Sequence, residues 1–326
     1  MPRSAATGPT PVPARRWPGG VPFLILMGVS DEGMPPGGPD GRTRRVLMAI
    51  CAVSGAVLAA DACVVEPRWI EVVRSVEFVP ALRASAPDLT LVHLSDLHVG
   101  RIGYRERRAI ALVNEARPDL VLVSGDLVRD SRSLPAAAAF LQALEARLGV
   151  FVVWGNHDYR DGVAEEGAAA LEAAGVRVLR NSSVFVRHPI GRIHIAGIDD
   201  PVTGRDNLAR AMRRVPRRDF CILLSHSPEI VASLGNWDVD MVLAGHTHGG
   251  QVRLPLIGAI WMPPGTRGFP EGWFDVGRDV RLHVSRGLGW SILPMRLFCR
   301  PRIDRITLRG GSPPGRPAPK SITRRS

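Results

Sequence analysis

Five short apolar runs in this chain each end in a cluster of polar side chains, and this repeated arrangement limits the folds that the sequence can adopt. A short apolar run followed by turn-forming residues is typical of a strand that is buried on both faces. Such strands occur in sheets that other layers of structure cover. The five clusters are Leu94-Ser95-Asp96-Leu97-His98, Leu122-Val123-Ser124-Gly125-Asp126, Val153-Trp154-Gly155-Asn156-His157-Asp158, Leu223-Leu224-Ser225-His226 and Val242-Leu243-Ala244-Gly245-His246-Thr247-His248-Gly249-Gly250-Gln251.

The first half of the chain alternates between strand-like and helical patterns. Residues 89–94, 120–123 and 150–154 are apolar and favour strands, whereas residues 104–116 and 136–148 have helical spacing. This βαβαβ order predicts a largely parallel sheet with helices on its faces. Ligands bind such sheets beyond the carboxyl ends of the strands, which is where all five clusters lie.

The second half of the chain predicts a second sheet. Its expected elements are hairpin strands at residues 176–186 and 192–198, a short helix at 208–215, buried strands at 220–224 and 239–244, and further strands at 281–285 and 303–308. The simplest architecture is an α/β fold of two packed sheets with helices outside, formed by one domain over residues 75–309.

Most polar side chains in the five clusters are of types that bind divalent metal ions. Asp96 and His98 are two residues apart beyond a strand end, so both can grip one ion. Asp126 has two carboxylate oxygens and can bridge two ions. The mixed nitrogen and oxygen set favours Mn, Fe, Co, Ni or Zn over an all-oxygen site for Ca or Mg. The candidate ligands are Asp96, His98, Asp126, Asn156, His226, His246 and His248, and His157 is a candidate for proton transfer.

The formal net charge of +11 comes largely from the two ends of the chain. Residues 1–45 carry six Arg and three acidic residues, and residues 310–326 carry three Arg, one Lys and no acidic residue. These segments contribute +3 and +4, which leaves +4 for the middle. Because that middle also has few aromatic residues for base stacking, no nucleic-acid partner is expected. Both basic ends are predicted to be disordered.

A hydrophobic segment, residues 46–65, follows the basic N-terminal segment. Its first 15 residues carry no charge, Arg44 and Arg45 precede it, and Ala60-Asp61-Ala62 resembles a signal-peptidase site. Its full length approaches that of a membrane span, so a cleaved signal and a retained anchor both remain open. In either case the arginine-rich side is expected in the cytoplasm and the part with the five clusters outside, with the cytoplasmic face of the membrane as the alternative.

The four cysteines form no C-x-x-C pair, so neither a thiolate zinc site nor a redox motif is indicated. Cys221 opens an apolar run and is expected in the core, whereas Cys63 and Cys299 could pair if the protein is exported. Isolated histidines are more often structural than metal ligands, and four remain unassigned for this reason: His93, His188, His194 and His283.

Taken together, Asp96-x-His98, Gly125-Asp126, Gly155-Asn156-His157-Asp158, His226 and Gly245-His246-x-His248 resemble the signature of calcineurin-like metallophosphoesterases. The resemblance covers about residues 88–308 and implies a four-layer αββα sandwich that binds two divalent metal ions, with Mn²⁺ ahead of Fe, Zn, Ni or Co. It implies that Asp96, His98, Asp126 and His248 bind one ion, and that Asp126, Asn156, His226 and His246 bind the other. It further implies that His157 protonates the leaving oxygen while Asp158 orients its imidazole.

The chain is also similar to a narrower branch of bacterial membrane-associated phosphodiesterases, which includes enzymes likened to UDP-2,3-diacylglucosamine pyrophosphatases. The shared features are Glu66-Pro67, His248-Gly249-Gly250-Gln251, Ser285-Arg286-Gly287-Leu288-Gly289 and Cys299-Arg300-Pro301, whereas Arg302 stands where an acidic residue is expected. This branch implies that a metal-bridging hydroxide attacks a phosphoester or pyrophosphate bond, on a lipid or envelope substrate. A protein phosphatase or nuclease of the same fold, or a metal-binding scaffold without activity, are the alternatives.

Apolar residues that follow the last candidate ligands have two interpretations. They can line a groove for acyl chains, or they can pack beneath a long loop. These residues are Leu254, Ile257, Ile260, Trp261, Phe269, Trp273 and Phe274.

Overall fold

The structure is a computed structural model that describes residues 40–264, 266, 268–277 and 279–312. The chain divides into two units, Met1–Val53 and Ser54–Ser326. Most of the two ends predicted to be disordered, residues 1–39 and 313–326, lies outside the described residues. The prediction of disorder is wrong for residues 41–45, which form the start of a helix.

The hydrophobic segment forms a helix. α1 (Gly41–Ala60) has no buried residue, and Asp40 caps its first turn by accepting a hydrogen bond from the Thr43 amide at 2.8 Å. A π turn (Asp61–Val65) and a 3-10 turn (Glu66–Arg68) continue it. Among the described residues, this 28-residue stretch is the one helix long and apolar enough to cross a membrane, a property that N-terminal signal sequences share.

All strands of the described residues belong to the second unit. The described strands are β1 (Glu71–Val79), β2 (Leu89–Leu94), β3 (Leu120–Ser124), β4 (Val150–Val153), β5 (Val176–Val178), β6 (Ser182–His188), β7 (Gly191–Gly197), β8 (Phe220–Leu224), β9 (Met241–Ala244), β10 (Arg253–Leu254), β11 (Gly258–Ala259), β12 (Gly272–Asp275), β13 (Arg281–Val284) and β14 (Arg302–Gly310).

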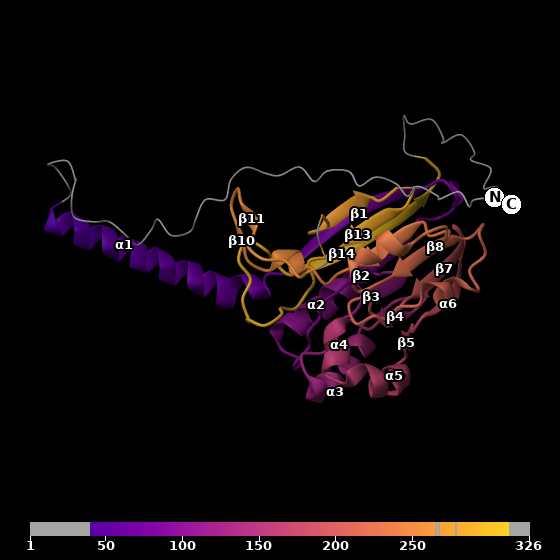
Figure 1. The fold of residues 1–326 in the computed structure, drawn as a ribbon, viewed down its shortest axis with the longest axis horizontal. Helices are drawn as coiled ribbons and strands as arrows, with labels where there is room; N and C mark the ends of the chain where they lie inside the picture. Colours follow the sequence, from indigo (N-terminus) through magenta and orange to yellow (C-terminus); the bar gives the residue numbers. More distant parts are fainter. Residues whose placement is uncertain (1–39, 265, 267, 278, 313–326) are drawn as a thin grey trace, which may run out of the picture. The chain divides into compact units, whose positions relative to one another are not determined.

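These strands form two six-stranded mixed sheets and one short hairpin, β10-β11 (Figure 1). The first sheet has the order β1-β14-β2-β3-β4-β5, in which β2 to β5 are parallel and β14 is antiparallel to β2. The second sheet has the order β12-β13-β9-β8-β7-β6, in which β13, β9, β8 and β7 are parallel and the two edge strands are antiparallel to their neighbours.

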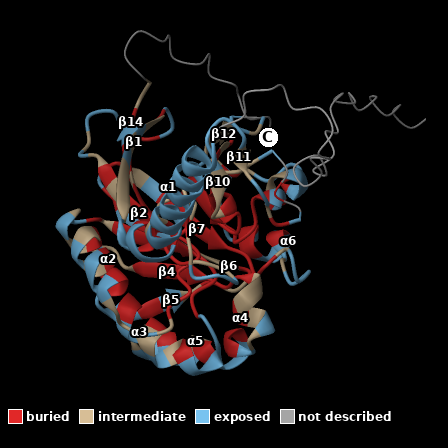
Figure 2. Cartoon of the chain, turned by 90° about the vertical axis from the view of Figure 1, so that its left-hand side faces the viewer, coloured by how far each residue is buried: buried red, intermediate tan, exposed pale blue. Residues whose placement is uncertain are grey.

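Helices cover the outer face of each sheet. The helices of this unit are α2 (Tyr104–Glu115), α3 (Leu134–Gln142), α4 (Asn156–Arg160), α5 (Val163–Ala173) and α6 (Leu208–Met212), with 3-10 turns at Ser131–Ser133, Pro228–Ser233 and His248–Gly250. Phe140 and Leu171 pack α3 and α5 against the first sheet, and Met212 packs α6 against the second. Figure 2 shows buried strands beneath helices whose outward faces are exposed. The order helix, sheet, sheet, helix confirms the predicted αββα sandwich.

Alternate side chains of the central strands enter different cores. Leu91 and Leu122 point between the two sheets, where they meet Ile222 of β8, whereas Val92 and Val121 point toward the helices. Each strand is therefore buried on both faces, which explains why its sequence is continuously apolar rather than alternating.

Two predicted helices end earlier in the structure, and the first of them, expected at residues 208–215, ends at Met212. Residues 136–148 were expected to be helical, yet α3 ends at Gln142. Asn114 of α2 donates a hydrogen bond to the Ala143 carbonyl at 3.0 Å and accepts one from the Glu145 amide at 2.9 Å. These contacts hold the backbone beyond Gln142 in a loop.

The predicted strand at residues 176–186 is two strands in the structure. β5 pairs with β4 in the first sheet, and β6 pairs with β7 in the second. Asn181, with a φ of 47°, lies between them, and its side chain bonds to Asp199 and to the Arg205 carbonyl. The left-handed backbone at Asn181 breaks the extended run, so the chain changes sheets here.

Candidate metal centre

All seven candidate ligands lie beyond the carboxyl ends of parallel strands. Asp96 and His98 follow β2, Asp126 follows β3 and Asn156 follows β4. The second sheet supplies the others, since His226 follows β8 and His246 and His248 follow β9. The two sheets thus contribute to one site, as the positions of the clusters in the sequence predict.

One group of four ligands surrounds a first potential metal position. The ligand atoms of Asp96, His98, Asp126 and His248 all lie within 4.8 Å of one another, and all four residues are buried. His98 Nε2 is 3.4 Å from Asp126 Oδ2, and His248 Nε2 is 3.4 Å from Asp96 Oδ1. Donor atoms about 2.0–2.2 Å from one ion have separations of this size.

A second group shares Asp126 with the first. His226 Nε2 lies 3.5 Å from Asp126 Oδ2, 3.0 Å from Asn156 Oδ1 and 3.1 Å from His246 Nδ1. Asp126 therefore stands between the two groups, in the position that a bridging carboxylate would need.

Several ligand atoms of this centre form no hydrogen bond with any residue that the structure describes. Asp96 Oδ1, His98 Nε2 and His248 Nδ1 are buried and accept or donate no hydrogen bond there. Buried polar atoms are otherwise almost always satisfied. The unsatisfied atoms, and the chemistry of the donor set, fit a divalent cation.

Five candidate ligands have a left-handed backbone, which non-glycine residues rarely adopt. The φ angles are 48° at Asp96, 41° at His98, 54° at Asp126, 69° at His246 and 51° at His248. Each such residue costs about 1–3 kcal/mol, and residues of this kind cluster at functional sites. These backbone conformations therefore lower the stability of the fold, but they direct the five side chains toward a common point.

Glycines allow the ligand loops to approach one another. A Cβ atom at Gly155 would lie 2.2 Å from Asp126 Oδ1, and one at Gly245 would lie 1.7 Å from Ser95 Oγ and 2.5 Å from Asp96 Oδ2. Neither contact is possible between non-bonded atoms, so both motif glycines are required for the ligands to converge.

Burial keeps most of the candidate histidine ligands neutral, which is the form that binds a metal. It lowers the pKa of His98 to about 4 and that of His246 to about 3. Burial also opposes the charged form of His226, but the Asp126 and Asp96 carboxylates raise the pKa of His226 to about 10. Two buried carboxylates thus attract positive charge to this centre, and a divalent cation held by the same atoms would satisfy it.

The candidate proton donor, His157, lies beside the ligands. Its ring is 5.0 Å from that of His98, and its backbone amide donates a hydrogen bond to Asp126 Oδ1 at 2.9 Å. Arg160 Nη2 lies 2.5 Å from His157 Nδ1. Because guanidinium can only donate, this contact leaves Nδ1 as the acceptor and the ring proton on Nε2. Arg160 was not predicted, although its position three residues later on α4 places it on the same helical face.

Asp158 has different partners from those expected. Its Oδ1 accepts hydrogen bonds from the Leu127 and Val128 amides at 2.8 and 3.2 Å, and its Oδ2 accepts one from the Gly155 amide at 2.9 Å. In the structure Asp158 therefore ties the loop after β3 to the loop after β4, and Arg160 rather than Asp158 contacts the His157 ring.

The four unassigned histidines have structural partners. His188 accepts a hydrogen bond from the Ile190 amide, and His194 lies 2.9 Å from Asp219. His93 Nδ1 lies 3.0 Å from His283 Nδ1 between the sheets, and Asp304 lies 3.4 Å from His283 Nε2. Arg302, the departure from the expected acidic residue, forms an ion pair with Asp304 and lies 3.5 Å from Glu271.

The apolar residues after the last ligands divide between the two interpretations. Phe269 and Phe274 pack against one core cluster and Trp273 against another, so these three lie under the loop. The rest are exposed, and they lie in and beside the β10-β11 hairpin: Leu254 is 38% exposed, Ile257 75%, Ile260 61% and Trp261 59%.

All four cysteines are free thiols in the structure. Cys221 is in the core, as predicted. Cys63 is exposed, whereas Cys299 is buried and its thiol donates to the His248 carbonyl at 3.3 Å. Cys299 therefore supports the ligand loop and is not paired with Cys63.

Comparisons with known proteins relate this chain to phosphoesterases. Residues 89–250 match the profile of the family described as calcineurin-like phosphoesterase. The chain is 32% identical over 225 residues to the uncharacterized metallophosphoesterase YkuE of Bacillus subtilis, covering 67% of this chain and 78% of that protein. It is 30% identical over 250 residues to phosphodiesterase YaeI of Escherichia coli, covering 74% of this chain and 90% of that protein.

Another relative is named as a transmembrane protein. The chain is 34% identical over 280 residues to a transmembrane protein with metallophosphoesterase domain of Danio rerio. The similarity covers 81% of this chain and 61% of that protein.

Proposed function

Because this chain belongs to the calcineurin-like phosphoesterase family of metal-dependent hydrolases, we propose that it is a phosphodiesterase whose two divalent metal ions share Asp126. The observation that carries the proposal is the convergence of two ligand groups on Asp126, which lies 3.4 Å from His98 in one group and 3.5 Å from His226 in the other. The name of the relative YaeI, a phosphodiesterase, favours a diester over a monoester.

The proposed ligand assignment follows the two groups. Asp96, His98 and His248 would bind one ion, Asn156, His226 and His246 the other, and Asp126 both. Bound in this way, two divalent ions supply a water activated at neutral pH and positive charge for the phosphate oxygens. The nitrogen and oxygen donors suit Mn²⁺, and Fe, Zn, Ni or Co are the alternatives.

The remaining chemistry is assigned to the chain's own residues. His157, with its proton on Nε2, would donate a hydrogen bond to the leaving oxygen; transfer of the proton would require the imidazolium form, in which Nδ1 also carries a proton. Arg160 holds the ring through Nδ1 and so selects the neutral tautomer that donates this hydrogen bond from Nε2. Asp158 is a positioning residue in this scheme, because it fixes the loops that carry Asp126 and Asn156 through three backbone hydrogen bonds.

The site is further proposed to act at a membrane. The 28-residue apolar helical stretch and the name of the Danio rerio relative support membrane association. The arginine-rich flank of α1 favours a catalytic unit on the extracytoplasmic side. A lipid or envelope phosphodiester is the substrate that this placement favours.

The test uses the full chain purified in detergent, stripped with EDTA and supplied with Mn²⁺. We expect two metal ions per chain by elemental analysis and hydrolysis of bis(p-nitrophenyl) phosphate. Asp126→Asn should bind fewer ions and lose turnover. His188→Gln, which changes a buried histidine outside the centre, is the matched control and should retain both. A wild-type chain that is inactive with Mn²⁺, Fe²⁺, Zn²⁺, Ni²⁺ and Co²⁺, or an active Asp126→Asn, would contradict the proposal.

A further inference from the structure

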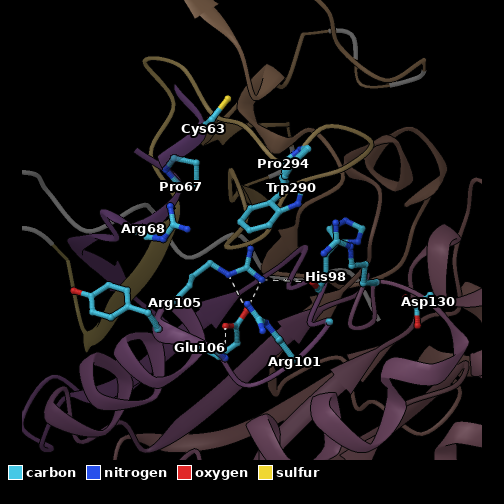
Figure 3. Close-up of a pocket in the computed structure, with 14 residues that line it drawn as sticks. Cys63, Pro67, Arg68, His98, Arg101, Arg105, Glu106, Asp130, Trp290 and Pro294 are labelled. Carbon is cyan, nitrogen blue, oxygen red and sulfur yellow. Dashed lines mark hydrogen bonds and ion pairs between the residues drawn. The ribbon is translucent and has the colours of Figure 1, made fainter. Parts of the chain in front are cut away.

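We propose that a basic cavity beside the metal centre binds the phosphate group of an anionic membrane lipid. The inference rests on the proposed phosphodiesterase function, whose substrate class it specifies. Figure 3 shows the cavity, which has a volume of about 580 Å³. Four arginines line it, namely Arg68, Arg101, Arg105 and Arg129, together with the carboxylates of Glu106 and Asp130.

Arg105 is a buried residue that lines this cavity. Its side chain lies 4.2 Å from the centre of the Trp290 ring, and its Nη2 donates to Glu106 Oε1 at 2.6 Å and to the Leu97 carbonyl at 3.2 Å. The residue is only 5% exposed, yet Arg105 Nη1 has no hydrogen-bond partner among the described residues. An unsatisfied buried guanidinium nitrogen is costly, so this donor indicates an anionic ligand.

The two carboxylates of the cavity are already engaged. Glu106 pairs with Arg105 and accepts a hydrogen bond from the Gly103 amide at 2.9 Å. Asp130 accepts hydrogen bonds from the Arg132 amide at 3.0 Å and from Ser133 Oγ at 2.8 Å. Arg101 and Arg129 form no ion pair with any residue that the structure describes. Two exposed guanidinium groups are therefore free to bind phosphate oxygens, which they match in geometry.

The cavity adjoins the proposed reaction centre. His98, a proposed metal ligand, is one of its lining residues. A phosphate held by the arginines would thus lie beside the site where a phosphoester bond is hydrolysed. A substrate with two anionic groups, one at each position, fits this arrangement.

Another part of the cavity wall comes from the chain just after the apolar helix. Cys63, Pro67 and Arg68 line the cavity, and α1 ends at Ala60. If α1 spans a membrane, chain connectivity holds these residues close to the membrane surface. Trp290 and Pro294 form a further part of the wall, and Ile292 and Leu293 between them are 85% and 56% exposed.

The exposed apolar loop is joined to both the helix end and the β10-β11 hairpin. The Arg296 amide donates to the Ala62 carbonyl at 2.9 Å. Gln251 Nε2 donates to the Ser291 and Leu293 carbonyls at 3.1 and 3.0 Å, which connects this loop to the strand that enters the hairpin. Basic residues beside exposed apolar side chains favour a ligand with a phosphate head and an apolar tail over a free phosphate ion.

The test measures binding without turnover. The full chain is reconstituted in phosphatidylcholine nanodiscs, and dihexanoyl phosphatidic acid is titrated by calorimetry in EDTA, with empty discs as the blank. We expect saturable binding that is at least about tenfold weaker in Arg101→Gln/Arg129→Gln, because each change removes charge-assisted hydrogen bonds. Arg101→Lys/Arg129→Lys, which keeps both charges, should recover part of the affinity.

Matched controls separate this site from general effects of charge. Arg108→Gln/Arg132→Gln removes the same charge from two exposed arginines outside the cavity and should bind like the wild type. Dihexanoyl phosphatidylcholine and inorganic phosphate should both bind at least about tenfold more weakly than the phosphatidic acid.

Each other outcome refutes a defined part of the inference. If Arg101→Gln/Arg129→Gln binds phosphatidic acid as the wild type does, the cavity is not the binding site. If inorganic phosphate binds as tightly as phosphatidic acid, the ligand is a free anion and not a lipid. Equal binding of the choline lipid excludes charge recognition. Because EDTA is present throughout, a chain that binds the lipid but hydrolyses no phosphodiester contradicts the proposed function alone.

Discussion

The left-handed backbone at the candidate ligands predicts that a glycine substitution there is more stable than an alanine substitution, which reverses the usual order. His246 has a φ of 69°. In an ordinary strand or helix, glycine is less stable than alanine by about 0.5–1 kcal/mol. At a left-handed position alanine carries a steric penalty of about 1–2 kcal/mol that glycine avoids. We therefore expect His246→Gly to be more stable than His246→Ala by about 1 kcal/mol, although both variants lose the same imidazole.

Thermal unfolding in EDTA measures this difference. For a domain of this size, about 1 kcal/mol corresponds to a Tm shift of about 2–4 °C, so His246→Gly should unfold at a temperature higher by that amount. Asn156 is the matched control, because it begins α4 with helical backbone geometry. Asn156→Gly should unfold below Asn156→Ala. An alanine variant at least as stable as the glycine variant at position 246 would refute the argument from backbone strain.

Three further results are expected. Gly155→Ala should fold but lose at least about 100-fold in kcat/KM, because the new Cβ would lie 2.2 Å from Asp126 Oδ1 and would displace this carboxylate. The metal content of the variant should also fall. Unchanged turnover would contradict the tight packing of Gly155 against Asp126. Addition of Mn²⁺ at 100 times its Kd to EDTA-treated protein should add about 2.7 kcal/mol to the free energy of unfolding, seen as a rise in Tm that Asp126→Asn diminishes. Burial lowers the pKa of His93 to about 3, so between that pH and the ordinary value of 6.5 the unfolded chain binds one proton more than the native state, and the free energy of unfolding should fall as the pH falls. Urea unfolding of His93→Gln in EDTA should show a pH dependence of this free energy that is smaller by about 1.4 kcal/mol per pH unit. The same pH dependence in both proteins would show that His93 is protonated in the fold.

The positions of the candidate ligands in the fold could be predicted from sequence because these positions depend on local rules. Each follows a buried parallel strand, and parallel strands present their carboxyl ends at one edge of a sheet. The fold class followed from the same runs, since burial on both faces requires a layer on either side.

Features that depend on distant partners could not be predicted. β1 pairs with β14 in a register that begins with Glu71 opposite Arg302. No local sequence pattern reveals a pairing between strands so far apart in the chain. The role of Asp158 depends on the Leu127 and Val128 amides, which belong to another loop. The arginines of the basic cavity are equally inconspicuous in sequence, because arginine is abundant throughout the chain and only the fold brings Arg68 and Arg129 to one cavity.

The division of the ligands between two sheets has a consequence for the order of assembly. Asp96, His98, Asp126 and Asn156 belong to the first sheet, and His226, His246 and His248 to the second. The halves meet directly, since the His246 amide donates to Asp96 Oδ2 at 3.0 Å and His226 Nδ1 lies 2.8 Å from the Ser124 carbonyl. Under the proposed ligand assignment, neither half of a growing polypeptide offers a complete ligand set to either ion. Binding of two ions would then follow the packing of the two sheets, and incomplete chains would be inert toward phosphoesters.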